Sequence, residues 1–240
     1  MIPLHDDNPT EIVPVFTVAF IMMCVLVYFW QVSLGQQGYQ EAVYSLGVIP
    51  AVLLDKIQLP PELLVVPAGF TVFTSMFMHG SFMHLAGNML YLWIFGNNVE
   101  DAMGHVRFVI FYLLCGIAAV FGQVIQDPAS QIPMIGASGA ISGILGAYLL
   151  LHPHSRVLVV IPLGFYMHMV RLPAGMVLGI WFVIQIMSSL AADPGSAGVA
   201  WFAHIGGFIA GMALISVFKY RRVRLFQPGH GSQRWHKRIR

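Results

Sequence analysis

The sequence has little charge for its length. Of its 240 residues only 9% are Asp, Glu, Lys or Arg and 58% are apolar, whereas charged residues make up about 25% of an average soluble domain. A compact soluble domain does not need so much apolar surface, so this composition predicts a polytopic membrane protein. Cysteine is also scarce. Cys24 and Cys115 both lie inside apolar runs, which argues against a disulfide framework.

Six apolar runs are candidates for membrane-spanning helices. They lie at about Val13–Val32, Phe82–Val99, Phe108–Ile125, Ser138–Leu151, Ala174–Leu190 and Ala200–Phe218. We therefore predict an all-α membrane protein in which residues 1–240 form a single domain, with a six-transmembrane-helix bundle over residues 13–218. At about 1.5 Å per residue the fourth run is roughly 22 Å long, less than a hydrocarbon core of ~30 Å. We expect a short buried fourth helix whose first residue, Ser138, lies at the floor of a water-filled cavity.

The basic residues are distributed unevenly between the two sides of such a bundle. With six spans, eleven of the twelve Lys and Arg residues fall on one side, and only Lys56 falls on the other. The positive-inside rule makes the basic side cytoplasmic. This assigns residues 1–12 and the basic segment 219–240 to two cytoplasmic tails. The loops predicted to lie outside are 33–81, 126–137 and 191–199.

Two of these segments have compositions that indicate contact with lipid. The loop 33–81 is rich in Leu, Pro, Tyr and Phe, so we expect it to be partly membrane-embedded and to support the bundle from the side. The basic tail 219–240 favours anionic membrane lipid over nucleic acid as a partner, because juxtamembrane basic residues commonly fix orientation. No cofactor motif and no phosphate-binding loop appears, and the sequence does not indicate an oligomeric state.

A serine stands where the fourth run begins, in Gly136-Ala137-Ser138-Gly139. The pattern alone has little specificity, and it is the remaining motifs of the chain that lead us to interpret Ser138 as a nucleophile at the start of a helix. The same stretch has an alternative interpretation, because Gly139 and Gly143 form a small-xxx-small pair of the kind that packs two helices closely.

A histidine lies near the start of the sixth run, and it supplies the base that a serine nucleophile needs. His204 is an ionisable residue inside an apolar run, where such residues are costly and usually functional. One and two turns later, Gly207 and Gly211 form a second small-xxx-small pair. If the two glycine faces pack together, His204 comes within reach of Ser138 and can accept its proton. No carboxylate lies near His204 in the run, so we predict a Ser–His dyad, the alternative being a buried histidine bonded to a backbone carbonyl.

The second run begins with two polar residues spaced for one helix face. His84 and Asn88 are four residues apart, and both are expected at the depth of Ser138. Their N–H groups, with the backbone N–H of Ser138, are suited to stabilising an oxyanion. An ordinary interhelical hydrogen bond is the alternative. Zinc bound by His79, His84 and His204 is another, but the spacing lacks the usual ligand pattern, so we predict no metal site.

Together these three motifs, in this order, resemble the rhomboid family of intramembrane serine proteases. The H-x-x-x-N of the second run, the G-x-S-G of the fourth and the A-H-x-x-G of the sixth carry the resemblance, which covers about residues 70 to 218. It implies Ser138 as nucleophile, His204 as base, and an oxyanion site formed by His84, Asn88 and the Ser138 amide. It also implies cleavage of single-span membrane proteins near their outer ends. The short six-span form is that of prokaryotes, which implies the plasma membrane.

The resemblance extends to one structural residue and fails at another position. Glu100, just past the second run, resembles an acidic residue that braces the helices on the inner side. Some members place Tyr one turn after the serine, stacked on the catalytic histidine. This sequence has Ser142 there, so other contacts must orient His204.

Two other classes of function remain as alternatives. One is an inactive rhomboid-like protein that binds membrane clients, although such proteins usually lose the serine or the histidine, and both are present here. The other is a transporter or channel with a polar path, which would need polar residues on the inner half of the third and fourth runs. Few occur there.

Overall fold

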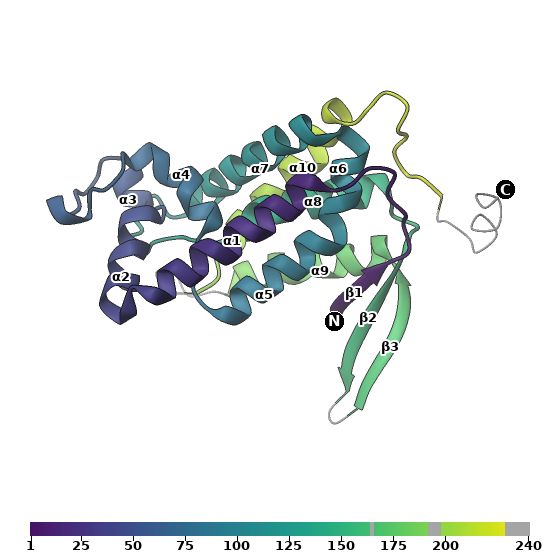
Figure 1. Cartoon of the computed structure of the whole chain (residues 1–240), viewed down its shortest axis with the longest axis horizontal. Coiled ribbons are helices and arrows are strands. Elements are labelled where there is room, and N and C mark those ends of the chain that lie inside the picture. The colour runs from purple at the N-terminus through teal and green to yellow at the C-terminus, as the bar shows by residue number, and fades with distance from the viewer. Residues whose placement is uncertain (164–165, 192–197, 229–240) are drawn as a thin grey trace.

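Helices form at all six predicted runs. The computed structural model describes residues 1–163, 166–191 and 198–228, and Figure 1 shows the whole chain. The helices at these runs are α1 (Val15–Ser33), α5 and α6 (Phe82–Tyr91 and Asn97–Met103), α7 (His105–Gln126), α8 (Ser138–Leu151), α9 (Ala174–Ala191) and α10 (Trp201–Phe218). A π-helical turn, Leu92–Gly96, joins α5 to α6. The apolar runs therefore located the helices to within a few residues.

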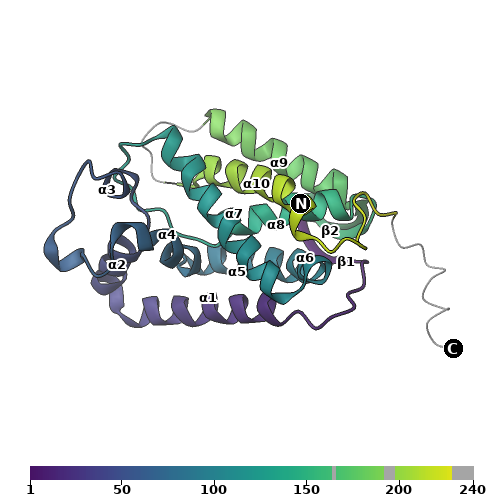
Figure 2. The same cartoon turned by 90° about the horizontal axis from the view of Figure 1, so that it is seen from above.

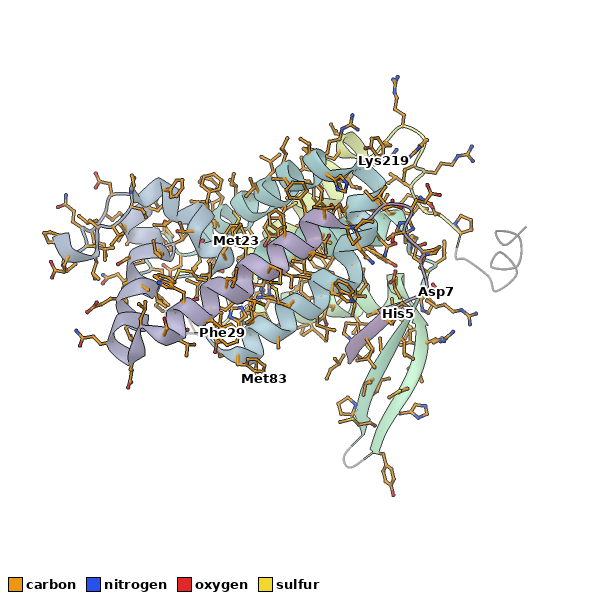
Figure 3. The ribbon with its side chains drawn as sticks, viewed as in Figure 1. His5, Asp7, Met23, Phe29, Met83 and Lys219 are labelled. Carbon is orange, nitrogen blue, oxygen red and sulfur yellow. The ribbon has the colours of Figure 1, made fainter. Side chains whose placement is uncertain are left out.

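Four of these helices are long and apolar enough to cross a membrane. Within the described residues they are α1, α7, α9 and α10. The segments Pro61–Phe77 and Phe82–Met103, which meet at a bend of 78°, make a fifth candidate if the pair is taken as one span. Apolar side chains such as Met23 and Phe29 of α1 point outward (Figure 3), and they are 44% and 61% exposed. Such an apolar outer surface suits lipid rather than water.

The short helix α8 lies at the centre of the bundle, packed between α7 and α10 (Figure 2). It has 14 residues, and nearly all of them are buried. A helix that is apolar all round is stable only in such a position. The prediction of a short buried fourth helix agrees with this arrangement.

Backbone-to-backbone packing along a line of glycines brings α8 close to α10. A Cβ atom at Gly207 would collide with the carbonyl oxygen of Gly139, and a Cβ atom at Gly211 would collide with that of Gly143. The four glycines predicted to be structural thus form one seam, in which any larger residue would force the helices apart. The seam also sets the distance between Ser138 and His204, the first polar residues at its end.

The predicted loop 33–81 contains short helices at the end of the bundle away from the strands (Figure 1). They are α2 (Gly35–Leu46), α3 (Pro50–Leu53) and α4 (Thr71–Thr74), with three-residue 3-10 turns at Pro61–Leu63, Ala68–Phe70 and Ser75–Phe77. Met134 pairs with Val48 through two backbone hydrogen bonds of 2.7 and 3.0 Å. This pairing attaches the loop before α8 to the first loop.

A three-stranded antiparallel sheet was not anticipated by the all-α prediction. It has the order β1-β2-β3, formed by Ile2–Asp6, Arg156–Leu163 and Tyr166–Pro173, and it extends away from the bundle at the end that holds the N-terminus (Figure 1). The run Val157–Ile161 is rich in β-branched residues, which favour strands. Residues 1–12, predicted as a tail, therefore contain a strand that pairs with a hairpin about 150 residues away.

Glu100 joins α6 to the start of α1. It is fully buried, and its carboxylate accepts hydrogen bonds from the backbone N–H groups of Phe16 and Thr17 at 3.0 and 2.8 Å and from the Thr17 hydroxyl at 2.7 Å. His105 Nδ1 donates to it as well, at 2.6 Å. A carboxylate at a helix N-terminus satisfies N–H groups that the helix leaves free and interacts favourably with its dipole. This geometry agrees with a bracing role.

Candidate active site

Ser138 and His204 lie in contact, at the adjacent ends of α8 and α10. The His204 Nε2 atom is 2.8 Å from the Ser138 hydroxyl oxygen, a distance at which the hydroxyl donates a hydrogen bond to the ring. His204 is only 9% exposed and Ser138 is half-buried. The structure therefore brings the predicted nucleophile and base together.

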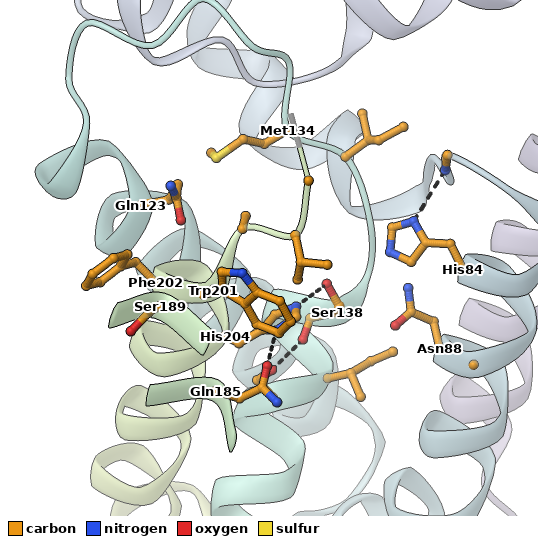
Figure 4. A pocket seen from close by; sticks show the side chains of 18 of the residues that line it. His84, Asn88, Gln123, Met134, Ser138, Gln185, Ser189, Trp201, Phe202 and His204 are labelled. Atoms are coloured by element: carbon orange, nitrogen blue, oxygen red, sulfur yellow. Dashed lines mark hydrogen bonds between the residues drawn. The ribbon is translucent and has the colours of Figure 1, made fainter. Parts of the chain in front are cut away.

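Both residues line a cavity of about 970 Å³. Its wall includes residues from the loop before α8, such as Ile132 and Ile135, and from the segment before α10, such as Val199. These segments belong to the predicted outer loops, of which residues 192–197 lie outside the described part of the chain. Figure 4 shows the cavity with Ser138 and His204 on one side. A space of this size holds water and an extended piece of peptide.

His84 and Asn88 face Ser138 from α5 across this cavity (Figure 4). The helix α5 begins after Ser81, whose hydroxyl accepts the His84 backbone N–H at 3.1 Å, as expected of an N-terminal cap. The Gly80 N–H group donates to His84 Nδ1 at 3.3 Å. Since Nδ1 is then the acceptor, the ring hydrogen is on Nε2, which leaves an N–H donor for the cavity.

The side-chain amide of Asn88 has an N–H donor without a partner within the described residues. Its side chain is 8% exposed, and within the described residues its Nδ2 atom is buried without a hydrogen-bond partner. A buried amide of this kind is costly unless something accepts its hydrogen bond. An oxygen atom bound next to Ser138 would be such an acceptor.

Gly136 leaves the space that this arrangement requires. Its φ of 130° is one that residues with a side chain rarely adopt. A Cβ atom there would lie 2.9 Å from His84 Nε2 and 3.6 Å from the Ser138 hydroxyl oxygen. The first glycine of the G-x-S-G pattern thus separates the two sides of the site.

The sequence analysis missed one residue, Gln185 of α9. Its Oε1 atom is 2.8 Å from His204 Nδ1, on the opposite side of the ring from Ser138 (Figure 4). We predicted that contacts other than a tyrosine at position 142 orient His204. The Gln185 amide is one such contact, and the rings of Trp181 and Trp201 are two more, with their centroids 6.0 and 6.1 Å from that of His204. An amide in an apolar run is costly in lipid. Gln185 could have been identified from the sequence on that ground.

The three histidines of the zinc alternative are not arranged as ligands. His79 is fully buried, with neither ring nitrogen hydrogen-bonded within the described residues, and its ring packs edge-on against that of His84 at 5.2 Å. Burial, and then the neighbouring His84, lower the pKa of His79 to about 4. Within the described residues no group of three His, Cys, Asp or Glu side chains could hold a metal ion.

Taken together, the apolar outer surface, the spanning helices and a buried Ser–His pair define a multi-pass membrane protein with a polar site inside its bundle. The family model of the Rhomboid domain matches residues 68–221, which include Ser138 and His204. The chain therefore belongs to the rhomboid family.

Similar proteins carry rhomboid names as well. The chain is 27% identical to Rhomboid protein 1, mitochondrial, of Saccharomyces cerevisiae over 73% of its length. It is 32% identical to the Rhomboid protease GluP of Bacillus subtilis over 57%, and 28% identical to the human Presenilin-associated rhomboid-like protein, mitochondrial, over 58%. These matches cover 49%, 24% and 35% of the relatives, so the chain spans about half or less of their length.

Proposed function

We propose that the protein is an intramembrane serine endopeptidase with a Ser138–His204 dyad. The observation that carries the proposal is the 2.8 Å contact between His204 Nε2 and the Ser138 hydroxyl at the wall of a cavity large enough for a peptide. The name of the Bacillus subtilis relative, a rhomboid protease, supports the same reaction class.

The chemistry follows from the positions of these groups. His204 Nε2 accepts the hydroxyl proton while the Ser138 oxygen attacks the carbonyl carbon of the scissile peptide bond. The carbonyl oxygen becomes an oxyanion, which the N–H groups of His84, Asn88 and the Ser138 backbone stabilise. The backbone N–H of Ser138 is available because it belongs to the first turn of α8.

The bond then breaks, and the acyl-enzyme is hydrolysed. His204 gives its proton to the departing amine nitrogen, which leaves the carbonyl carbon esterified to Ser138. A water molecule from the cavity attacks this ester, His204 accepts the water proton, and that proton returns to Ser138 as the acid product leaves. No metal or cofactor is needed for these steps.

The substrates we propose are single-span membrane proteins, cut in their transmembrane segments near the outer ends. The cavity is lined by residues of the predicted outer loops, such as Ile132 and Val199, and Figure 1 shows the sheet and the N-terminus at one end of the molecule. The N-terminal strand and the end of α10 lie at the same end, where Tyr220 N–H bonds to Ala102 of α6 at 2.9 Å. This suits six crossings of a plasma membrane with both termini cytoplasmic and the basic residues near lipid.

Labelling with a fluorophosphonate probe tests the proposal. We expect the purified protein to be labelled, and the Ser138→Ala and His204→Ala variants, with unchanged thermal unfolding, not to be. Absence of labelling in folded wild-type protein would instead favour a client-binding protein without catalysis. Ser142→Ala is the matched control, because the Ser142 hydroxyl donates to the Ser138 carbonyl oxygen at 2.6 Å rather than to His204.

A further inference from the structure

Gln185 stands where a catalytic triad would hold a carboxylate. It is 5% exposed and contacts His204 at Nδ1, the ring nitrogen that does not face Ser138. In a Ser–His–Asp triad the group at this nitrogen fixes the tautomer and orientation of the ring. Here an uncharged amide occupies that place.

A second hydrogen bond determines which way the amide faces. Gln185 Nε2 donates to the backbone carbonyl oxygen of Trp181, one turn earlier in α9, at 3.1 Å. The amide oxygen is therefore the atom that faces His204, and since it only accepts, Nδ1 of the histidine must carry the hydrogen. This leaves His204 Nε2 unprotonated, which is the state that can accept the Ser138 proton.

The position of Gln185 is fixed by aromatic packing between α9 and α10. The rings of Phe182 and Phe208 are stacked with centroids 4.3 Å apart, and Trp181 also stacks on Phe208 at 5.9 Å. These contacts lie within one turn of Gln185 and of His204. They hold the amide against the imidazole, so the geometry of the dyad depends on where α9 sits.

We propose that Gln185 is a positioning residue that selects the reactive tautomer of His204 and holds its ring toward Ser138. The inference rests on the proposed function. An amide serves at this buried position because an ionised carboxylate inside an apolar bundle is costly unless it is fully paired. Gln185 acts through His204 and does not touch the substrate in this scheme.

Three variants of α9 separate positioning from a general effect on the fold. Gln185→Leu removes the acceptor, Gln185→Glu keeps an acceptor and adds a charge, and Ile184→Ala truncates a neighbour that is 51% exposed on the same helix. Each is assayed for thermal unfolding, for fluorophosphonate labelling rate, and for kcat and KM on a transmembrane peptide substrate as a function of pH. Gln185→Met replaces Gln185→Leu if the latter does not fold.

We expect kcat of Gln185→Leu to fall at least about tenfold with little change in KM, because the ring loses its tautomer and orientation. Gln185→Glu should recover much of the rate, and the acid limb of its kcat/KM profile should move to higher pH because the carboxylate stabilises the imidazolium form. His84 and Asp127 line the same cavity, and both are unchanged in these variants. Ile184→Ala should match wild type.

Wild-type kcat and an unchanged pH profile in Gln185→Leu would overturn the positioning role. So would equal losses in the Leu and Glu variants with an unshifted acid limb, since a packing role alone predicts that result. Failure of the proposed function looks different. In that case folded wild-type protein is not labelled at all, whatever residue stands at 185.

Discussion

The two ends of the bundle differ in how fully their buried polar groups are hydrogen-bonded, although one atom at the sheet end, Asn8 Oδ1, also lacks a partner within the described residues. At the cavity end, several buried polar atoms have no hydrogen-bond partner within the described residues, among them Asn88 Nδ2 and both ring nitrogens of His79. At the end with the sheet, the carboxylate of Glu100 accepts four hydrogen bonds. The carboxylate of Asp6 there accepts from Tyr148 and Asn98. Unsatisfied groups cost stability but remain free to bind a reacting atom, whereas satisfied ones hold the fold together.

The helix α8 connects these two ends. Ser138 opens it in the cavity, and Tyr148, near its last turn, donates a hydrogen bond of 2.6 Å to Asp6 of the N-terminal strand. A short helix that is buried at almost every residue cannot shift without disturbing its neighbours. The sheet end therefore holds in place the helix that carries the nucleophile. We expect substitutions at the sheet end to lower stability and substitutions at the cavity end to lower activity.

The largest expected effect is at Glu100. Glu100→Ala leaves the two buried donors of Thr17 and the partly buried donors of Phe16 and His105 without an acceptor, and we expect a loss of about 3–5 kcal/mol in the free energy of unfolding. Protein that remains folded should still react with the fluorophosphonate probe at the wild-type rate. Thermal unfolding in detergent and labelling per folded molecule measure the two quantities.

The neighbouring Asp101 is the control for Glu100. It accepts one backbone hydrogen bond, from Ile12 at 3.0 Å, so Asp101→Ala should cost about 1 kcal/mol. A Glu100→Ala protein that unfolds at the wild-type temperature would contradict the assignment of stability to the sheet end. A slowed labelling rate in its folded fraction would contradict it too.

The corresponding test at the cavity end is Asn88→Ala. Removing one oxyanion donor should lower kcat about 100- to 1000-fold, equivalent to about 3–4 kcal/mol. Stability should stay the same or rise, because the Nδ2 atom is a buried donor without a partner in the described structure. Cleavage of a transmembrane substrate and thermal unfolding are the measurements, and a destabilised protein with a normal kcat would show that Asn88 is structural.

The sequence predicted most of the cavity end, because its chemistry follows short motifs. The G-x-S-G stretch, the A-H-x-x-G stretch and the spacing of His84 and Asn88 each place a polar group at a helix terminus or on one helix face. The glycine seam then implied that Ser138 and His204 meet. Gln185 was missed because a single amide in α9 belongs to no motif, and only the packing of α9 on α10 shows which residue it contacts.

The opposite end was predicted less well, because its contacts join residues far apart in the chain. Arg156 and Arg171 are two of the eleven basic residues on the predicted cytoplasmic side, and their charge does not indicate that the residues between them form two strands. The strand β1 can be recognised only by its pairing with that hairpin. Interactions at such sequence separation leave no periodic pattern in either segment.

The smallest expected effect concerns pH at the sheet end. Burial raises the pKa of Asp6 from 3.8 to about 6, against the hydrogen bond from Tyr148, which lowers it. The folded state therefore binds this proton more tightly than the unfolded state. Its contribution to stability is fully present below about pH 3.8 and is lost as the pH rises through about 6. The shift corresponds to about 2–3 kcal/mol.

Asp6→Asn isolates this contribution. The amide keeps an oxygen that accepts from Tyr148 or Asn98, but it does not titrate, so the stability of the variant should lose this dependence between about pH 4 and 6. Thermal unfolding of both proteins at several pH values in that range gives the comparison, with Asp7→Asn as the control on the neighbouring carboxylate, which accepts the Arg156 N–H at the exposed edge. Parallel curves for wild type and Asp6→Asn would mean that Asp6 is ionised in the folded protein. The hydrogen bonds from Tyr148 and Asn98 would then offset the effect of burial on the Asp6 carboxylate.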